Sequence, residues 1–455
     1  MLKTLFAKIP KLKKYFHFLL SAMVCLSIIC YQSYPVSSQE NNNNEEELSI
    51  VDLEQISQTI AKVEAKWERD YEGYFRRDFR NKARSTQEIA EHLTDISQKT
   101  GIRPAVIWAM PMDKFLELIL ITPDNQLALK KIRSADRDTL ELIVNQLDNA
   151  IADRESTRYL PPAKQIYQWL IAPLEPYLEA ENIDTLLLCT GPTLRSLPFA
   201  VLHDGKQFII EKYNLTRIPA FGLTDTEYEE RPDKQVLAMG ASEFKDLPDL
   251  PGVAVELSTI TPILWDGEKF INEDFTIKNL MKLQQQGKFD IVHLATHAEF
   301  RPGEPNQSYI QFSDRALTLD QITQLNLDSP QVDLLVLSAC ETALGNEDAE
   351  FGFAGLAMQA GVKSVLASLW TINDAGTVAL MSQFYQELKS TPVKAEALRK
   401  AQLAMLNKNI SLESGKLRSS EFDVSLPPEL NNDVGLENIN HPFYWAGFTI
   451  IGNPW

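Results

Sequence analysis

Continuous apolar runs alternate with amphipathic segments through the C-terminal half of the chain, and this alternation limits the fold more than any other feature. Four runs have the length and composition of buried strands: Val236 to Met239, Asp290 to Ala295, Leu334 to Ala339 and Ser364 to Leu369. Four intervening segments show helical spacing of apolar residues: Val253 to Thr261, Thr276 to Gln285, Phe351 to Ala360 and Ala375 to Leu388. Strands that are apolar along their whole length are buried on both faces. The pattern therefore predicts an α/β domain with a mostly parallel sheet flanked by helices.

The rest of the chain divides into segments of different composition. Residues 39–47 form a polar linker, and residues 48–101 have helical periodicity, with Ile56, Ile60, Val63 and Trp67 at three- and four-residue steps. Residues 102–232 mix the two periodicities, and a polar run at 226–234 marks their end. We expect strands at 105–112, 116–122 and 185–189, helices at 136–152 and 162–178, a loop at 410–440 and a final strand at 443–451.

The first 38 residues carry a targeting signal. They contain five lysines and no acidic residue, an apolar run from Tyr15 to Tyr31, and small residues up to Ser38. A basic start, a short apolar region and small residues after it are typical of a secretory signal peptide, here with a cut before Gln39. The apolar run is also compatible with an uncleaved membrane anchor. Both interpretations place the body outside the cytoplasm, in the periplasm or the extracellular space, with membrane contact only through this segment.

Charge and missing motifs exclude several classes of function. The net charge is -18, so the chain repels phosphate backbones and nucleic acid is not expected as a partner. The sequence has no Cys/His spacing typical of zinc, no Gly-Lys-Ser/Thr phosphate loop and no Gly-x-Ser-x-Gly elbow. The acidic run at 347–350 is expected to be a solvated loop, as is Glu341.

A histidine and a cysteine each follow one of the predicted strands. His297 comes after the strand that ends at Ala295, and Cys340 comes directly after the strand that ends at Ala339. Ligand sites in open parallel sheets lie beyond the carboxyl ends of the strands, so both side chains are expected at the same rim. A thiol nucleophile needs an imidazole to take its proton. Cys189 also ends an apolar run, which favours two single cysteines over a disulfide.

The residues around this pair extend into longer motifs. They are His293-Leu-Ala-Thr-His297-Ala, Leu335-Val-Leu-Ser-Ala-Cys340-Glu-Thr-Ala-Leu-Gly345, Phe353-Ala-Gly-Leu-Ala-Met-Gln-Ala-Gly361, Ser368-Leu-Trp370 with Asp374, and His441-Pro-Phe-Tyr-Trp445-Ala-Gly-Phe. In this order they resemble the signature blocks of the CHAT domain family, caspase-like cysteine peptidases of the caspase and separase clan. The resemblance extends over about residues 102–455. The tetratricopeptide repeats that often accompany the domain are missing from this sequence.

The resemblance implies a fold and a set of roles. Residues 102–232 correspond to a degenerate caspase-like half and residues 233–455 to the catalytic half. His297 matches the catalytic histidine and Cys340 the nucleophile. The backbone N–H groups of Ala298 and Cys340 would hold the oxyanion, although the family commonly has glycine in place of Ala298. The sequence itself suggests two supporting residues. His293, inside a strand, is expected to orient or pack against the site, and Thr296 is expected to support His297 by hydrogen bonding.

Substrate selection is expected to rest on Asp374. The segment Leu369-Trp-Thr-Ile-Asn-Asp374 is similar to the separase segment whose aspartate binds an arginine side chain. The alternative for Asp374 is a helix N-cap before Ala375. Ser338, two residues before the nucleophile, stands where metacaspase-type enzymes carry an acidic residue.

The sequence thus predicts a cysteine endopeptidase that acts on a protein or peptide substrate, cleaves after arginine or lysine, and needs no metal or organic cofactor. The alternative is a CHAT fold that serves as a scaffold or signalling adaptor without turnover.

Overall fold

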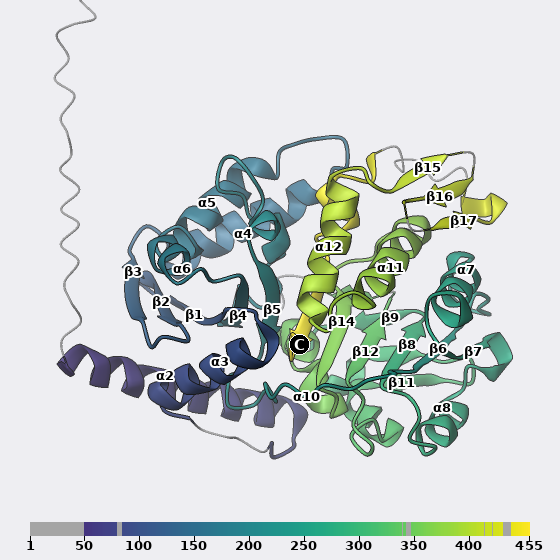
Figure 1. Ribbon diagram of the computed structural model, residues 1–455, viewed down its shortest axis with the longest axis horizontal. Coiled ribbons are helices and arrows are strands. Elements are labelled where there is room, and N and C mark those ends of the chain that lie inside the picture. Colours follow the sequence, from purple (N-terminus) through teal and green to yellow (C-terminus); the bar gives the residue numbers. More distant parts are fainter. Residues whose placement is uncertain are drawn as a thin grey trace, which may run out of the picture. The chain divides into compact units, whose positions relative to one another are not determined.

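The computed structural model describes residues 50–79, 84–338, 340–342, 347–413, 415–420, 422–430 and 438–455 (Figure 1). The predicted signal peptide or anchor and the polar linker lie outside these residues. Among the described residues, none of the helices is both long and apolar enough to cross a bilayer. Residues 50–455 form one compact unit.

A single sheet of eleven strands runs through this unit (Figure 1). Neighbouring strands are antiparallel where β2 meets β1 and β3 and where β18 meets β14, and the other neighbouring pairs are parallel. In spatial order the strands are β3 (Leu127–Ile132), β2 (Phe115–Ile121), β1 (Pro104–Met112), β4 (Thr185–Thr190), β5 (Asn214–Ile218), β18 (Phe448–Gly452), β14 (Ser364–Ser368), β12 (Leu334–Leu337), β8 (Ile291–Ala295), β6 (Val236–Gly240) and β7 (Gly267–Ile271).

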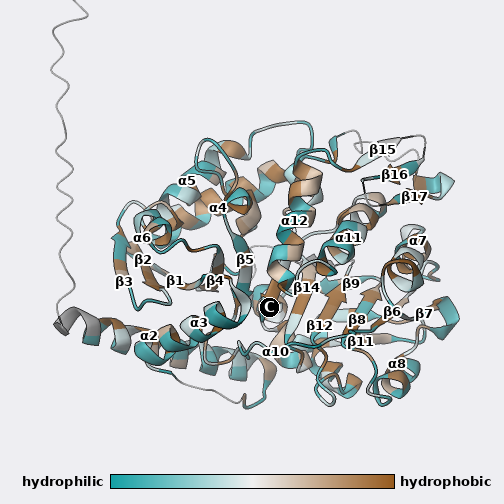
Figure 2. Ribbon diagram, viewed as in Figure 1, coloured by the Kyte–Doolittle hydropathy of each residue, from teal (hydrophilic) through white to brown (hydrophobic). Residues whose placement is uncertain are grey.

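The central strands are buried on both faces, as their continuous apolar sequences predict. Every residue of β6, β8, β12 and β14 is buried. Along β12, Leu334 and Val336 join one hydrophobic core while Leu335 and Leu337 join a second. Successive side chains of a strand point to opposite faces, so the two cores lie on the two sides of the sheet. Figure 2 shows much of these central strands in brown, the hydrophobic end of its colour scale. The predicted fold class is confirmed.

Helices cover both faces of the sheet. Helices α4, α5, α7, α11 and α12 contribute to the first core, and α2, α8, α9 and α10 contribute to the second (Figure 1). The helices are α2 (Ile50–Phe75), α3 (Thr86–Thr100), α4 (Arg137–Ile151), α5 (Leu160–Leu170), α6 (Glu175–Ala180), α7 (Gly252–Ser258), α8 (Ile277–Gln284), α9 (Glu347–Ala354), α10 (Leu356–Ala360), α11 (Asp374–Leu388) and α12 (Lys394–Leu406).

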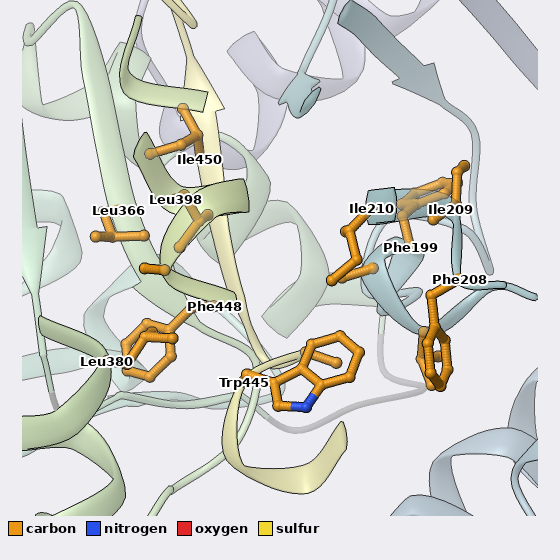
Figure 3. Packing of buried hydrophobic residues seen from close by; sticks show 14 of the residues in the cluster. Phe199, Phe208, Ile209, Ile210, Leu366, Leu380, Leu398, Trp445, Phe448 and Ile450 are labelled. Carbon is orange, nitrogen blue, oxygen red and sulfur yellow. The ribbon is translucent and has the colours of Figure 1, made fainter. Parts of the chain in front are cut away.

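The last strand of the chain joins the strands of residues 102–232 to those of residues 233–455. Strand β18 pairs with β14 on one side and with β5 on the other, where Ile450 is opposite Thr216. Near this junction the Trp445 ring meets the Phe208 ring edge to face at 5.4 Å (Figure 3). The strands of residues 102–232 and those of residues 233–455 therefore belong to the same eleven-stranded sheet.

The first described helix is fixed to the body by its apolar face. Ile56, Ile60 and Trp67 of α2 are buried, as the spacing predicts. The Glu64 carboxylate accepts hydrogen bonds from Trp108 Nε1 and from the backbone N–H groups of residues 221 and 222. Burial raises the pKa of Glu64 above its ordinary value. This helix is therefore an integral part of the fold.

Several predicted elements differ from the structure. The final strand, expected at 443–451, begins only at Phe448, after a short 3-10 helix at Pro442–Tyr444. The helix expected at 162–178 ends at Leu170 and resumes at Glu175, because Pro173 has no N–H to donate and clashes with the preceding turn. The loop expected at 410–440 contains a small antiparallel sheet, and the side chain of Leu417 is fully buried in the first core. Its strands are β15 (Ser411–Glu413), β16 (Lys416–Arg418) and β17 (Asp423–Ser425).

Candidate active site

Two neighbouring parallel strands carry the predicted catalytic pair. His297 follows β8 and Cys340 follows β12, and β8 and β12 are adjacent and parallel. Beyond their ends the chain forms a second small sheet, with strand order β11 (Ala316–Thr318), β10 (Tyr309–Gln311), β9 (Ala298–Phe300) and β13 (Cys340–Thr342).

Strands β9 and β13 are parallel, and their register places Cys340 directly opposite Ala298. Paired strands lie about 4.8 Å apart. The backbone of the predicted nucleophile therefore lies one strand spacing from the residue that follows His297. For residues 340–342 the structure describes the backbone alone.

The imidazole of His297 is held by a main-chain carbonyl. Its Nε2 lies 2.8 Å from the Pro248 carbonyl oxygen, and the Phe244 ring contacts the imidazole at 4.7 Å between centroids. A carbonyl oxygen can only accept, so Nε2 carries a hydrogen. In the neutral ring this leaves Nδ1 as the atom that accepts a proton. The contact with Pro248 thus fixes the tautomer of the neutral ring.

Two hydrogen bonds to strand β10 hold the chain in place around this histidine. The N–H of Gln311 donates to the His297 carbonyl at 2.8 Å, and the Thr296 hydroxyl donates to the Gln311 carbonyl at 2.6 Å. Thr296 thus contacts the backbone of β10, which in turn holds His297. Ala298 does not have a positive φ, so alanine occupies the usual glycine position without backbone strain.

His297 lines a cleft with a volume of about 380 Å³. Its walls come from the segment before α7, from α7 itself, from the ends of β8 and β12, and from the start of α11. The described residues that line it are Leu247, Pro248, Leu250, Gly252, Val253, Glu256, His297, Ala298, Glu299, Tyr309, Ser338, Thr371, Ile372, Asp374 and Thr377. The cleft thus brings the predicted base together with Ala298 and Asp374.

Asp374 is the first residue of α11 and is half-buried. Its Oδ2 accepts a hydrogen bond from the N–H of Gly252, the first residue of α7, at 2.9 Å. A side chain on Gly252 would meet Asp374 at 2.8 Å, so only glycine permits this approach. The N-cap of α11 is Asn373, whose side chain accepts from the Gly376 N–H. The capping role predicted as the alternative for Asp374 therefore belongs to the preceding residue.

A buried polar group lies beneath the cleft. His293, in the middle of β8, is fully buried, and its Nδ1 lies 3.1 Å from the Tyr385 hydroxyl. Its Nε2 lies 3.1 Å from Glu256 Oε1, at an angle outside the range of a hydrogen bond. Glu256 also accepts from the Ser338 hydroxyl at 3.3 Å. His293 therefore contacts a residue that lines the cleft, without lining it itself.

Two groups at this site were not expected from the sequence. The Pro248 carbonyl is a main-chain group, which residue type does not reveal. Glu256 lies in a predicted helix, and an acidic residue on a helix is ordinarily solvated. One feature of the sequence could have indicated that Glu256 is buried. It lies among the apolar residues of 253–261, on the buried side of that helix.

The acidic run at 347–350, which follows the predicted nucleophile, is not the solvated loop that was expected. Residues 347–354 form helix α9, and Glu350 is buried and accepts a hydrogen bond from the Ser196 hydroxyl at 2.6 Å. Asp348 accepts from the Gly303 N–H. The run folds because its apolar neighbours, such as Phe353, are buried in the second core. The side chain of Glu341 lies outside the described residues.

The remaining reactive groups lie elsewhere. Cys189 in β4 is buried and free, and burial raises the pKa of its thiol well above the ordinary value. Within the described ranges, no three side chains of His, Cys, Asp or Glu form a group that could hold a metal ion.

Comparison with known proteins gives a matching family and a set of similar solved structures. No curated protein matches the chain. Two crystal structures of the Saccharomyces cerevisiae separase–securin complex are similar to it, each with 10% sequence identity, with TM-scores of 0.44 and 0.42. The similarity covers 81% of this chain and 31% of the other, so this chain spans about a third of that protein's length. The model of the CHAT domain matches residues 160–453. Because this match covers well over half of the sequence, the chain belongs to the CHAT domain family.

Proposed function

We propose that this protein is a cysteine endopeptidase. The observation that carries the proposal is the register of β9 and β13, in which Cys340 is opposite the residue that follows His297. The cleft that His297 lines supports the proposal, because it leaves room for a peptide beside the imidazole. Membership of the CHAT family supports the same chemistry.

The proposed reaction uses the chain's own groups. His297 Nδ1 takes the proton of the Cys340 thiol, and the thiolate sulfur attacks the scissile carbonyl carbon. The N–H groups of Ala298 and Cys340 donate to the oxygen that becomes negative. His297 returns the proton to the leaving amine as the C–N bond breaks, leaving a thioester. Water, deprotonated by His297, then releases the acid product and the thiol. No metal or organic cofactor enters any step.

The proposed selectivity is for arginine or lysine before the scissile bond. Asp374 supports it because its carboxylate lies in the same cleft as His297 and is oriented by the Gly252 N–H. A carboxylate that is partly removed from water binds a guanidinium or ammonium group strongly.

The test is peptide cleavage by the purified full chain and its Cys340→Ala variant, with a library that varies the residue before the bond. We expect cleavage by the parent and none by the variant, with equal thermal stability. Cys189→Ala is the matched control, because that thiol is fully buried. A folded parent that cuts no peptide would favour the scaffold or adaptor. Equal cleavage by Cys340→Ala would overturn the mechanism.

A further inference from the structure

The proposed catalytic pair lies where the chain passes from the large sheet to the small one. The pairing of β12 with β8 ends at Leu337, and the pairing of β13 with β9 begins at Cys340. Ser338 on one segment and His297 on the other fall between these two registers. Strand pairing alone does not set the spacing of the two segments here, so contacts with other elements contribute to it.

Ser338 is held from two sides. It is buried, and its N–H donates to the carbonyl of Leu294 in β8 at 3.1 Å. Its hydroxyl donates to Glu256 Oε2 of α7 at 3.3 Å. Because Ser338 is two residues before Cys340, these bonds hold the chain just before the predicted nucleophile.

Glu256 contacts both segments that carry the pair. Besides Ser338 after β12, its carboxylate meets His293 in β8, with Oε1 3.1 Å from His293 Nε2. The other ring nitrogen of His293, Nδ1, lies 3.1 Å from the Tyr385 hydroxyl of α11. Each of these side chains is buried. Buried polar groups that contact one another in this way hold their elements in a single arrangement.

The helix that carries Glu256 also holds other parts of the site. The N–H of Gly252, at the start of α7, donates to Asp374. In the segment before α7, the Pro248 carbonyl oxygen lies 2.8 Å from His297 Nε2. A helix is a rigid element, so α7 couples the orientation of the imidazole to the placement of the segment before the nucleophile.

We propose that Glu256 is a positioning residue for the catalytic pair. It holds the segment before Cys340 against β8 and so keeps the thiol within reach of His297. A displacement of about 1 Å at a reacting group can cost on the order of a hundredfold in rate, so this contact matters for catalysis as well as for the fold. The inference rests on the proposed peptidase function, because it concerns the geometry of the same pair.

The first test compares kcat and KM for a peptide with arginine before the scissile bond. Glu256→Leu keeps the approximate size of the side chain and removes both acceptor oxygens. We expect kcat to fall on the order of a hundredfold, with KM nearly unchanged. Glu256→Gln still accepts from Ser338 and should retain most of the activity. Ser338→Ala should also lower kcat, and the double variant with Glu256→Leu should be no worse than Glu256→Leu alone.

Ser364→Ala is the matched control for the loss of a buried hydroxyl. The Ser364 hydroxyl donates to the Asp333 carbonyl at 2.8 Å, at the start of β14 and away from the cleft. Its removal should leave kcat unchanged. Thermal unfolding of each variant checks the fold. If Glu256→Leu does not fold, Ser338→Ala carries the comparison by itself.

The second test needs no turnover. Iodoacetamide, which reacts with thiolates, is applied to the full chain over a range of pH, and mass spectrometry follows the adduct at Cys340. An imidazole held beside a thiol favours the thiolate. We therefore expect the labelling rate of the parent to rise at a lower pH than that of Glu256→Leu or Ser338→Ala, by about one pH unit. A purely structural role for Glu256 would lower thermal stability and leave this profile unchanged.

The two tests separate this inference from the peptidase proposal. If no peptide is cut but the labelling profile depends on Glu256 and Ser338, the peptidase proposal fails and the positioning role stands. If peptides are cut and neither variant changes kcat or the labelling profile, or if Ser364→Ala loses as much kcat as Ser338→Ala, the positioning role is overturned and the peptidase proposal stands. If no peptide is cut and the profile is the same in all variants, both are overturned.

Discussion

At the scale of residues, the site depends on a few groups held by the main chain. His297 is oriented by the Pro248 carbonyl and held through the backbone of Gln311. Asp374 is oriented by the N–H of Gly252. Side chains fixed in this way lose little freedom when a substrate binds, which is the condition for precise positioning.

His297→Ala should abolish peptide cleavage while the protein stays folded. We expect a loss on the order of a thousandfold or more, and we expect the double variant with Cys340→Ala to be no worse than either single variant, because the two groups act as one unit. Initial rates at saturating peptide measure this. Losses that multiply in the double variant would show that the two residues act independently.

Asp374→Asn should reduce the preference for basic residues on the order of tenfold or more, because the amide still accepts from Gly252 but carries no charge. Asn373→Ala is the matched control. It removes the N-cap of α11, at a cost of about 1 kcal/mol in the free energy of unfolding, without touching the cleft. Peptide-library profiling compares the two. An unchanged profile for Asp374→Asn would assign this residue to structure alone.

The sequence predicted the residues whose types are informative and missed those whose roles depend on the fold. His297, Ala298 and Asp374 line one cleft, as expected from motifs at strand and helix ends. The Pro248 carbonyl and the burial of Glu256 depend on contacts between segments far apart in the chain, and these leave no local pattern.

At the scale of elements, long periodic segments were predictable and short ones were not. Strands β6, β8, β12 and β14 have mostly apolar sequences and occur where expected. Strands β9, β10, β11 and β13, which position the proposed pair, have three residues each, too few to show a period of two. The predicted helix at 351–360 is divided at Gly355, where any side chain would collide with the Phe75 ring.

A buried ion-pair cluster connects several of these elements. Asp333, just before β12, lies 2.9 Å from Lys394 at the start of α12 and 2.7 Å from Lys234. Burial favours the neutral acid, but the two ammonium groups outweigh it and hold the pKa of Asp333 well below its ordinary value. Lys394 also donates to the carbonyl of Trp455, so the cluster anchors the end of the sheet.

Asp333→Asn should lower the free energy of unfolding by about 3–5 kcal/mol, because it leaves the buried Lys394 without its counterion. The stabilisation by Asp333 is fully present above the ordinary pKa of 3.8 and is lost as the pH falls below it towards the folded-state pKa. Denaturant unfolding at several pH values measures both effects. Asp95→Asn, which breaks the exposed pair with Lys99, should cost far less. Equal losses of unfolding free energy in Asp333→Asn and Asp95→Asn would contradict the stabilising role of the buried cluster.

At the scale of the whole molecule, the sheet is completed by its last strand. Strand β18 lies between β5 and β14, so the end of the chain connects strands from residues 102–232 with strands from residues 233–455. Such long-range pairing has no local sequence signal, although the aromatic segment before β18 was a hint that the end of the chain is buried. Figure 3 shows one residue of that segment, Trp445, among buried hydrophobic side chains.

We propose export for the whole molecule, on the basis of the lysine-rich start and the apolar run that follows. A reporter that is active only in the cytoplasm, fused after Glu47, should remain silent. A fusion that lacks residues 1–38 is the control and should be active. Activity of the first fusion would contradict the proposed location, whether the segment is a signal peptide or an anchor.

The proposal that His297 activates Cys340 is tested most directly by thiol labelling. The purified full chain is treated with an electrophilic thiol probe that mimics a peptide, and mass spectrometry locates the adduct. We expect an adduct at Cys340 that is lost in Cys340→Ala, forms much more slowly in His297→Ala and is unchanged in Cys189→Ala. Labelling of Cys340 that is equally fast without His297, or no labelling of Cys340 in a folded parent, would contradict the claim.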